Sequence, residues 1–303
     1  MMKLLCLGLD GFDHREWGKH MADLGYQYAV LHSPLPASGP AWTSIYTGMT
    51  PAEHGVRDTW GRAMPGSKTH ADVCNRAVWN LLPGVSCAIC NLPVTDPPSK
   101  VDGFMVSGFY QRPDAYWPPT LAMPQNWLQL SDLCWTDGIA DMGTWRNALY
   151  GAGKTYAARW TFSCCDRLLD WFVRAVGDRD IDLGWLAFTY PDRLLHAWPG
   201  DPDIFLFIAE LTRGIIKRLE QTLAPDAMLI MSDHGFSETE DEHTKQGVIA
   251  WRGLQMARTK FTNWDIAHIV AARFGVTLGG AGAYSEEDIA VINQRLRDLG
   301  YLG

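Results

Sequence analysis

Apolar strand-like runs alternate with stretches of helical periodicity along most of the chain. The strand-like runs cover residues 3–9, 85–91, 183–189 and 227–232. Apolar side chains recur at helical spacing over about 156–176 and 203–223, and the tail over 285–299 has the pattern of a final amphipathic helix. Strands that alternate with helices are typical of a mostly parallel sheet covered by helices. The pattern therefore predicts an α/β fold.

Three of the four strand-like runs lead into acidic residues or histidines. Asp10 follows the first run, Asp192 lies three residues beyond the third, and the pair Asp233 and His234 follows the fourth. In a parallel α/β sheet, ligands bind beyond the carboxyl ends of the strands. We therefore expect these side chains to meet at one edge of the sheet and to form a functional site there.

The alternation breaks over residues 103–158. This stretch contains several prolines and tryptophans but little clean periodicity. We interpret it as a cap, or irregular insertion, that lies over the strand ends. The chain is then one catalytic domain over residues 1–303 that includes a small cap.

Composition limits the partners. With 303 residues, 47% of them hydrophobic, the chain can bury a full core. The net charge of −8 and the lack of a basic run exclude long nucleic acid as the main partner, whereas a small phosphorylated molecule drawn in by bound cations fits. No stretch reaches the roughly 20 apolar residues that span a membrane, and the first apolar run stops at Asp10 without a small-residue cleavage site.

The seven cysteines form an odd count without the spacing of a disulfide framework, and Cys164 and Cys165 are neighbours inside a helical pattern. Reduced thiols are the rule in reducing compartments. The cysteines therefore predict a cytoplasmic protein.

The segment around Ser38 predicts the start of a helix. Pro40 suits the first turn, an apolar face follows it, and Gly48 can end the helix. Ser38 then lies at the helix N-terminus, where free N–H groups and the helix dipole favour an anionic oxygen. On local sequence alone, the pattern favours a simple N-cap role for Ser38 over a functional one.

Two other pairs suggest metal ligands. Asp192 and His196 are four residues apart, so a helix that begins near Pro191 would place both on one face. A surface carboxylate and a half-buried histidine would give the same pattern. Asp233 and His234 end an apolar strand, and burying both without a partner or a metal would be costly.

Together these segments resemble the alkaline phosphatase superfamily, most closely its type I phosphodiesterase and nucleotide pyrophosphatase branch. The resemblance covers most of residues 1–255 and implies a three-layer αβα sandwich with a mostly parallel central sheet. It rests on Leu7-Gly8-Leu9-Asp10-Gly11, Gly48-Met49-Thr50-Pro51-Ala52-Glu53-His54-Gly55-Val56, Asn91-Leu92-Pro93-Val94-Thr95-Asp96-Pro97-Pro98 and the segment up to His243.

The resemblance also implies a two-metal site. It places the nucleophile at Ser38, where many relatives have threonine, and it implies one cation held by Asp10, Ser38, Asp233 and His234. The second cation is held by Asp192, His196 and His243. One cation would coordinate the Ser38 oxygen and lower the pKa of the hydroxyl, so that the alkoxide attacks phosphorus. Mixed Asp and His ligands suit Zn²⁺ best, with Mn²⁺ as the alternative.

Two further details concern the substrate. Superfamily sulfatases need an arginine four residues after the nucleophile, and Trp42 stands there in this chain. Where nucleotide pyrophosphatases have an asparagine that contacts the phosphoryl oxygen, this chain has Thr59 and Trp60. Thr59 could make that contact with its hydroxyl, and Trp60 could stack on a base or sugar. These two residues are the expected substrate contacts.

The leading functional hypothesis is a phosphodiesterase or nucleotide pyrophosphatase that cleaves a small, nucleotide-like ester through a phospho-seryl or nucleotidyl-seryl intermediate. A phosphomonoesterase or phosphonate hydrolase would use the same site with more positive groups on the terminal phosphate oxygens, and Arg57, Arg62 and Lys154 are the candidates. A third hypothesis is an inactive binding protein on the same fold. Substitution of Ser38 by alanine would separate this last hypothesis from the first two.

Overall fold

The structure is a computed structural model that describes residues 2–57, 67–108, 116–123, 151–237, 241–256 and 258–279. Its strands are β1 (Leu4–Leu9), β2 (Gln27–His32), β3 (Cys87–Leu92), β4 (Gly103–Ser107), β5 (Tyr116–Trp117), β6 (Leu183–Phe188), β7 (Met228–Met231), β8 (Gly235–Phe236), β9 (His243–Thr244), β10 (Gln246–Arg252) and β11 (Lys260–Thr262). Its α-helices are α1 (His14–Asp23), α2 (Ser38–Thr47), α3 (Pro51–His54), α4 (His70–Val73), α6 (Lys154–Gly177), α7 (Tyr190–Ala197), α8 (Pro202–Leu223) and α9 (Asp265–Arg273). Two short 3₁₀ helices, η1 (Cys74–Arg76) and η2 (Val78–Asn80), follow α4.

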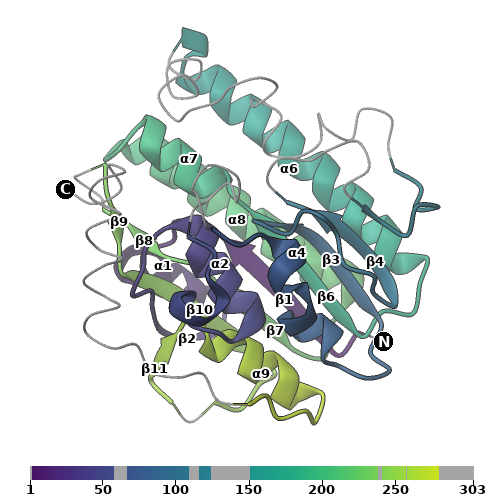
Figure 1. Ribbon diagram of the computed structural model, residues 1–303. Helices are drawn as coiled ribbons and strands as arrows, with labels where there is room; N and C mark the ends of the chain where they lie inside the picture. Colours follow the sequence, from purple (N-terminus) through teal and green to yellow (C-terminus); the bar gives the residue numbers. More distant parts are fainter. Residues whose placement is uncertain are drawn as a thin grey trace.

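Within the described residues, nine strands form one sheet in the order β11-β2-β10-β7-β1-β6-β3-β4-β5 (Figure 1). β1 lies between β6 and β7 and pairs in parallel with both. β3 and β4 extend the parallel part beyond β6, whereas β10 and β5 run antiparallel to their neighbours. The predicted α/β fold with a mostly parallel sheet is confirmed.

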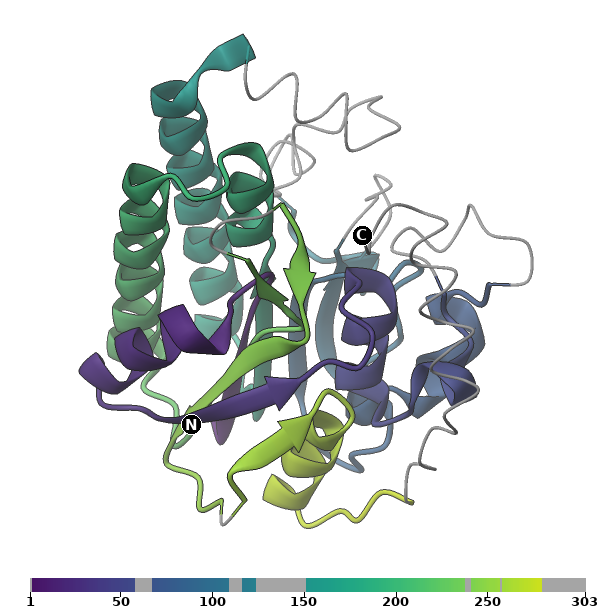
Figure 2. The same ribbon diagram turned by 90° about the vertical axis from the view of Figure 1, so that its left-hand side faces the viewer.

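The sheet separates two hydrophobic cores. Side chains alternate across a strand, so Leu5 and Leu7 of β1 pack in the core under α1, α6 and α8. Leu4 and Cys6 point the other way, into the core that α2 and α9 cover. Figure 2 shows helices on both sides of the sheet. This arrangement is the predicted three-layer αβα sandwich.

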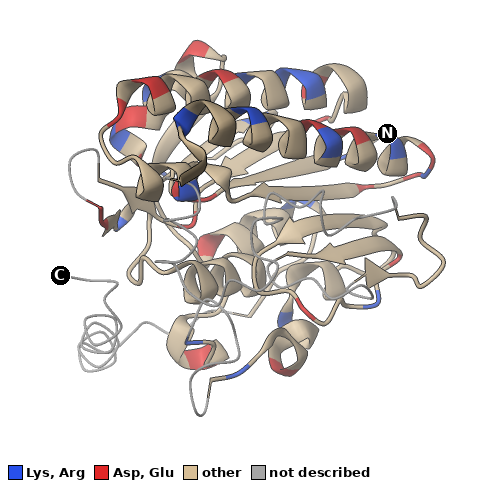
Figure 3. Cartoon of the chain, turned by 90° about the horizontal axis from the view of Figure 1, so that it is seen from above, with Lys and Arg blue, Asp and Glu red and all other residues tan. Residues whose placement is uncertain are grey.

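The two long helices α6 and α8 pack side by side on the outer surface. An ion pair joins them, with Arg218 Nη1 2.8 Å from Asp166 Oδ1. Acidic and basic residues are both spread along these helices (Figure 3). Asp201 caps α8 by accepting hydrogen bonds from the N–H groups at the helix start, and Pro202 occupies its first turn. None of the described helices combines the length and apolar character that a membrane span requires.

The predicted strands and long helices agree with the structure to within a few residues. The antiparallel strand β10, its neighbour β2 and the edge strand β11, which pairs with β2, were not predicted. The expected cap over residues 103–158 stays a prediction because much of it lies outside the described residues. At its two ends the chain is regular, since β4 begins at Gly103 and α6 begins at Lys154. The expected helix over 285–299 also lies outside the described residues.

Candidate active site

The order of the central strands brings the predicted residues together. Because β1 has β6 and β7 as its direct neighbours, Asp10, Asp192 and Asp233 leave the same edge of the sheet. Gly11 permits the close approach between them. It has a φ of +76°, and a Cβ atom on it would lie 3.0 Å from the Cα atom of Asp192.

Ser38 is the first residue of α2, as expected, but it is not the N-cap. Ala37 takes the N-cap position with extended backbone angles, and no side-chain bond caps the helix. The N-cap interpretation of Ser38 was therefore wrong, because the helix begins one residue earlier than that role requires. The Ser38 hydroxyl instead points into the site. Its Oγ lies 3.4 Å from Asp10 Oδ1 and 3.4 Å from His234 Nε2.

Asp10, Asp233 and His234 form a first cluster around the Ser38 hydroxyl, and all three are buried. His234 Nε2 lies 3.3 Å from Asp10 Oδ1 and 3.3 Å from Asp233 Oδ2. The other ring nitrogen, Nδ1, is 3.0 Å from the carbonyl oxygen of Gly235. A carbonyl only accepts hydrogen bonds, so Nδ1 carries the proton and Nε2 directs its lone pair at the two carboxylates.

Asp192, His196 and His243 form a second cluster. His243 Nε2 is 3.1 Å from Asp192 Oδ1, and His196 Nε2 is 3.5 Å from the same oxygen. The two Nε2 atoms are 2.8 Å apart. The ring of His243 stacks on that of His234 with centroids 3.8 Å apart, so the second cluster directly adjoins the first. All seven residues expected to bind metal thus lie in one site.

Burial and neighbouring charges act on the three carboxylates in different ways. Burial, with the nearby Asp192 adding to it, raises the pKa of Asp10 to about 7. Burial and the Asp10 charge raise the pKa of Asp233 well above its usual value. Burial also disfavours ionised Asp192, but His196 and His243 outweigh it and lower the pKa of this carboxyl below its usual range. Burial lowers the pKa of His234. The protein alone does not balance the charge of the first cluster.

The converging acceptors fit divalent cations. Both carboxylate oxygens of Asp233 and Oδ1 of Asp192 are buried and have no hydrogen-bond donor within the described residues. Buried acceptors without donors are costly, and a cation satisfies several of them at once. Imidazole and carboxylate ligands together suit divalent transition metals such as Zn²⁺. The first cluster and the second cluster therefore each fit one such cation.

Three residues that sequence reasoning did not assign to the site support it from outside. Trp42, which stands where superfamily sulfatases have arginine, donates its Nε1–H to Asp10 Oδ2 over 3.3 Å. Asn263 donates to the backbone carbonyl of Asp233 over 2.9 Å. Asp241 lies 2.6 Å from His196 Nδ1. Their partners are distant along the chain, so no local pattern signals the last two contacts.

Thr59 and Trp60, the expected substrate contacts, and the candidate cation Arg62 lie outside the described residues. Lys154 does not reach toward the site: its ammonium is 2.8 Å from Asp201 Oδ2 and 2.9 Å from Asp203 Oδ2.

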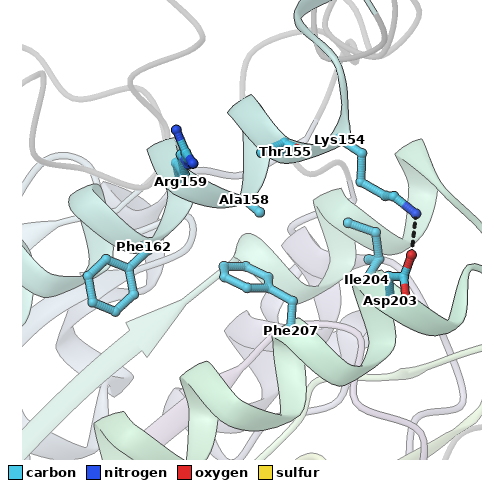
Figure 4. Close-up of a pocket in the computed structure, with 8 residues that line it drawn as sticks. All are labelled: Lys154, Thr155, Ala158, Arg159, Phe162, Asp203, Ile204 and Phe207. Atoms are coloured by element: carbon cyan, nitrogen blue, oxygen red, sulfur yellow. Dashed lines mark hydrogen bonds and ion pairs between the residues drawn. The ribbon is translucent and has the colours of Figure 1, made fainter.

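Figure 4 shows the ion pair between Lys154 and Asp203 at one end of a cavity between α6 and α8. The cavity measures about 460 Å³, and Phe162 and Phe207 line its apolar part. Lys154 is therefore engaged in linking two helices.

The chain matches one protein family over most of its length. The sequence model described as type I phosphodiesterase / nucleotide pyrophosphatase matches residues 5–271. That span contains every residue of both clusters. A comparison with curated proteins gives no significant match.

Solved structures share the fold at low identity. The phosphonate monoester hydrolase of Agrobacterium radiobacter matches with a TM-score of 0.54 at 12% identity, over 93% of this chain and 76% of that chain. An inactive murine ectonucleotide pyrophosphatase / phosphodiesterase 5 in complex with AMP gives 0.53 at 12%, over 93% and 98%. Alkaline phosphatase from the Antarctic bacterium TAB5 gives 0.51 at 10%, over 90% and 98%. These matches establish an alkaline phosphatase-like fold.

Proposed function

This chain belongs to the type I phosphodiesterase / nucleotide pyrophosphatase family, and from that premise we propose that it hydrolyses a small phosphate diester or pyrophosphate through a covalent intermediate on Ser38. The observation that carries the proposal is the position of the Ser38 hydroxyl, 3.4 Å from Asp10 and 3.4 Å from His234. The second cluster adjoins this point, so a phosphoryl group on Ser38 would meet both clusters.

Two divalent cations, Zn²⁺ or Mn²⁺, held by the first and second clusters, would lower the pKa of the Ser38 hydroxyl and neutralise charge on the phosphoryl oxygens. The protein supplies the geometry. Ser38 opens α2, where the free N–H groups and the helix dipole favour an anionic oxygen and a bound phosphate. Asp10 is fixed next to it by the indole of Trp42.

The reaction then has two displacements. The Ser38 oxygen attacks phosphorus, a new P–O bond forms, and the bond from phosphorus to the leaving alcohol or nucleotide oxygen breaks. The leaving oxygen takes up a proton. In the second displacement a water oxygen attacks phosphorus, and the Ser38 oxygen leaves and regains its proton. The products are a phosphomonoester and the released alcohol or nucleotide.

The placement of Lys154 supports a diester over a monoester as the substrate. A phosphomonoester carries one more ionisable oxygen, so its cleavage benefits from an additional cationic side chain. Lys154, one of the three candidates, is bound by Asp201 and Asp203. Trp42 stands where a sulfatase would have arginine. The murine relative that binds AMP supports a nucleotide-like substrate.

The test combines metal content with turnover of bis(4-nitrophenyl) phosphate and 4-nitrophenyl phosphate, before and after treatment with a chelator. We expect about two Zn²⁺ or Mn²⁺ per chain, faster cleavage of the diester, and loss of turnover on chelation that added metal restores. Faster cleavage of the monoester would favour the phosphomonoesterase alternative. Protein that binds no metal and cleaves neither ester would instead be a binding protein on this fold.

A further inference from the structure

We infer that Asp241 is a positioning residue for the second cluster. It holds the ring of His196 so that the Nε2 atom of this ring faces the cation site. The inference rests on the proposed function, because it assigns a role toward the proposed cation.

The contact from Asp241 to His196 is short and well defined. Asp241 Oδ1 lies 2.6 Å from His196 Nδ1, within the range of a charge-assisted hydrogen bond. An ionised carboxylate only accepts, so Nδ1–H donates and the proton of a neutral His196 ring is fixed on that atom. The lone pair of Nε2 then points toward Asp192 Oδ1, 3.5 Å away. Asp241 therefore selects the tautomer that can bind a cation.

The other two histidines of the site are held differently. His234 donates from Nδ1 to the carbonyl of Gly235, and His243 donates from Nδ1 to the carbonyl of Pro36 over 2.8 Å. Among these three Nδ1 contacts, only the one to His196 comes from a carboxylate. A negative partner makes the far nitrogen of an imidazole a stronger donor to a metal. Loss of Asp241 should therefore weaken the second cluster in particular.

The position of Asp241 in the chain gives the contact a second effect. Asp241 lies two residues before His243, so one short segment holds His196 through Nδ1 and supplies its neighbour ligand His243. Thr244, next in the chain, donates to Asp13 at the start of α1. The segment is thus tied to α7 and to α1, and the distance between His196 and His243 depends on the bond from Asp241.

Stability alone does not account for this carboxylate. The Asp241 side chain is 34% exposed, and an exposed ion pair adds little to the free energy of unfolding. Removing it should thus leave the fold intact. In metalloproteins, loss of such a partner of a ligand typically weakens metal binding 10–100-fold, roughly, without changing the ligands themselves.

The experiment is a Zn²⁺ titration of chelator-treated protein in competition with a chromogenic zinc indicator. We expect wild-type protein to bind about two Zn²⁺. Asp241→Ala should weaken one of the two binding constants roughly 10–100-fold and leave the other unchanged. Asp241→Asn keeps a hydrogen-bond acceptor but loses the charge, so its weaker binding constant should lie between those of wild type and Asp241→Ala. Glu242→Gln removes the same charge from the neighbouring exposed residue and should match wild type.

A second measurement reports the tautomer directly. In ¹⁵N spectra of the metal-free protein, we expect the His196 ring of wild type to carry its proton on Nδ1, with the His196→Ala spectrum providing the assignment. Asp241→Ala should shift the ring toward a mixture of tautomers. A purely structural role for Asp241 would leave this signal unchanged.

The outcomes separate the two proposals. If wild type binds two Zn²⁺ and folded Asp241→Ala binds both with unchanged affinity, the role of Asp241 is wrong while the proposed function stands. If wild type binds no Zn²⁺ or Mn²⁺, the proposed function fails, and the role of Asp241 toward a cation fails with it.

Discussion

The Nε2 atoms of His196 and His243 lie 2.8 Å apart, although the hydrogen bonds of both rings place their protons on Nδ1. While both rings are neutral, two lone pairs face each other, and Asp192 Oδ1 lies 3.1 Å from His243 Nε2. Three acceptors without a donor between them repel one another. A cation that binds all three removes this repulsion.

The first prediction is that metal stabilises the fold. A ligand that binds only the folded state adds about 2.7 kcal/mol to the free energy of unfolding when its concentration is a hundred times its dissociation constant. Scanning calorimetry of chelator-treated protein should therefore show a higher Tm after addition of Zn²⁺. Asp192→Ala should show a smaller rise because it lacks one cluster. An unchanged Tm in wild type at saturating Zn²⁺ would argue against both clusters as metal sites.

The second prediction concerns Asp233, whose carboxylate oxygens have no hydrogen-bond donor among the described residues. Asp233→Ala should lose metal from the first cluster and lose turnover together. Asp233→Asn should also bind metal weakly, since a neutral amide oxygen replaces a charged ligand. Elemental analysis of the purified variants measures the metal, and a diester assay measures the turnover. Full metal content in Asp233→Ala would remove this residue from the ligand set.

The third prediction concerns Asn263, which is buried and donates to the carbonyl of Asp233 and to Ser33 Oγ, each over 2.9 Å. Asn263→Ala leaves these acceptors without a donor and should lower the free energy of unfolding by about 1–3 kcal/mol. Asn80 is the matched control, because its amide donates to a backbone carbonyl on the exposed surface. Urea denaturation should show a clearly smaller loss for Asn80→Ala, and equal losses would contradict the role of Asn263.

The fourth prediction is a pH dependence of stability from His70. The ring is buried, with Nδ1 3.3 Å from the Tyr46 hydroxyl and Nε2 3.0 Å from Ser99 Oγ. Burial lowers its pKa to about 4, from 6.5 for an ordinary histidine. Between pH 6.5 and pH 4, His70 binds a proton in the unfolded chain but not in the folded chain. The free energy of unfolding therefore keeps its full value with respect to His70 above pH 6.5 and decreases as the pH falls toward 4.

The test compares urea denaturation of metal-free wild type and His70→Gln at pH 7 and pH 5. Glutamine does not titrate, so the drop in the free energy of unfolding between the two pH values should be smaller in the variant by about 2 kcal/mol. His54, whose pKa burial also lowers, is present in both proteins and cancels in the comparison. Equal drops in both proteins would show that His70 titrates normally in the folded state.

Much of the fold could be predicted because its central strands are buried on both faces. Such strands appear in the sequence as continuous apolar runs, and β1, β6 and β7 were recognised in this way. β2 alternates exposed and buried residues, with Tyr28 40% exposed, and gives a weaker signal. The order of the strands could not be predicted from the sequence either, because pairing such as that between β10 and β7 depends on tertiary contacts.

In the candidate site, too, some residues could be predicted from the sequence and others could not. Asp10 and Asp233 directly follow apolar strands, so their convergence follows from the rule for parallel sheets. The position of Ser38 at a helix start was predicted from Pro40, but local sequence could not separate a capping hydroxyl from one that points into the site. Asp241 contacts a residue 45 positions away and has no local pattern. Supporting contacts of this kind can be identified only from the structure.

The most direct test of the account measures diester turnover and metal content on the same preparations of wild type, Ser38→Ala and Ser38→Thr. The proposed role of Ser38 predicts that Ser38→Ala keeps nearly all its metal, because Asp10, Asp233 and His234 remain, while turnover falls by roughly 10³-fold or more. Ser38→Thr keeps the hydroxyl and should retain substantial turnover. If Ser38→Ala, with its metal bound, still cleaves the diester at a rate near that of wild type, Ser38 is not the nucleophile.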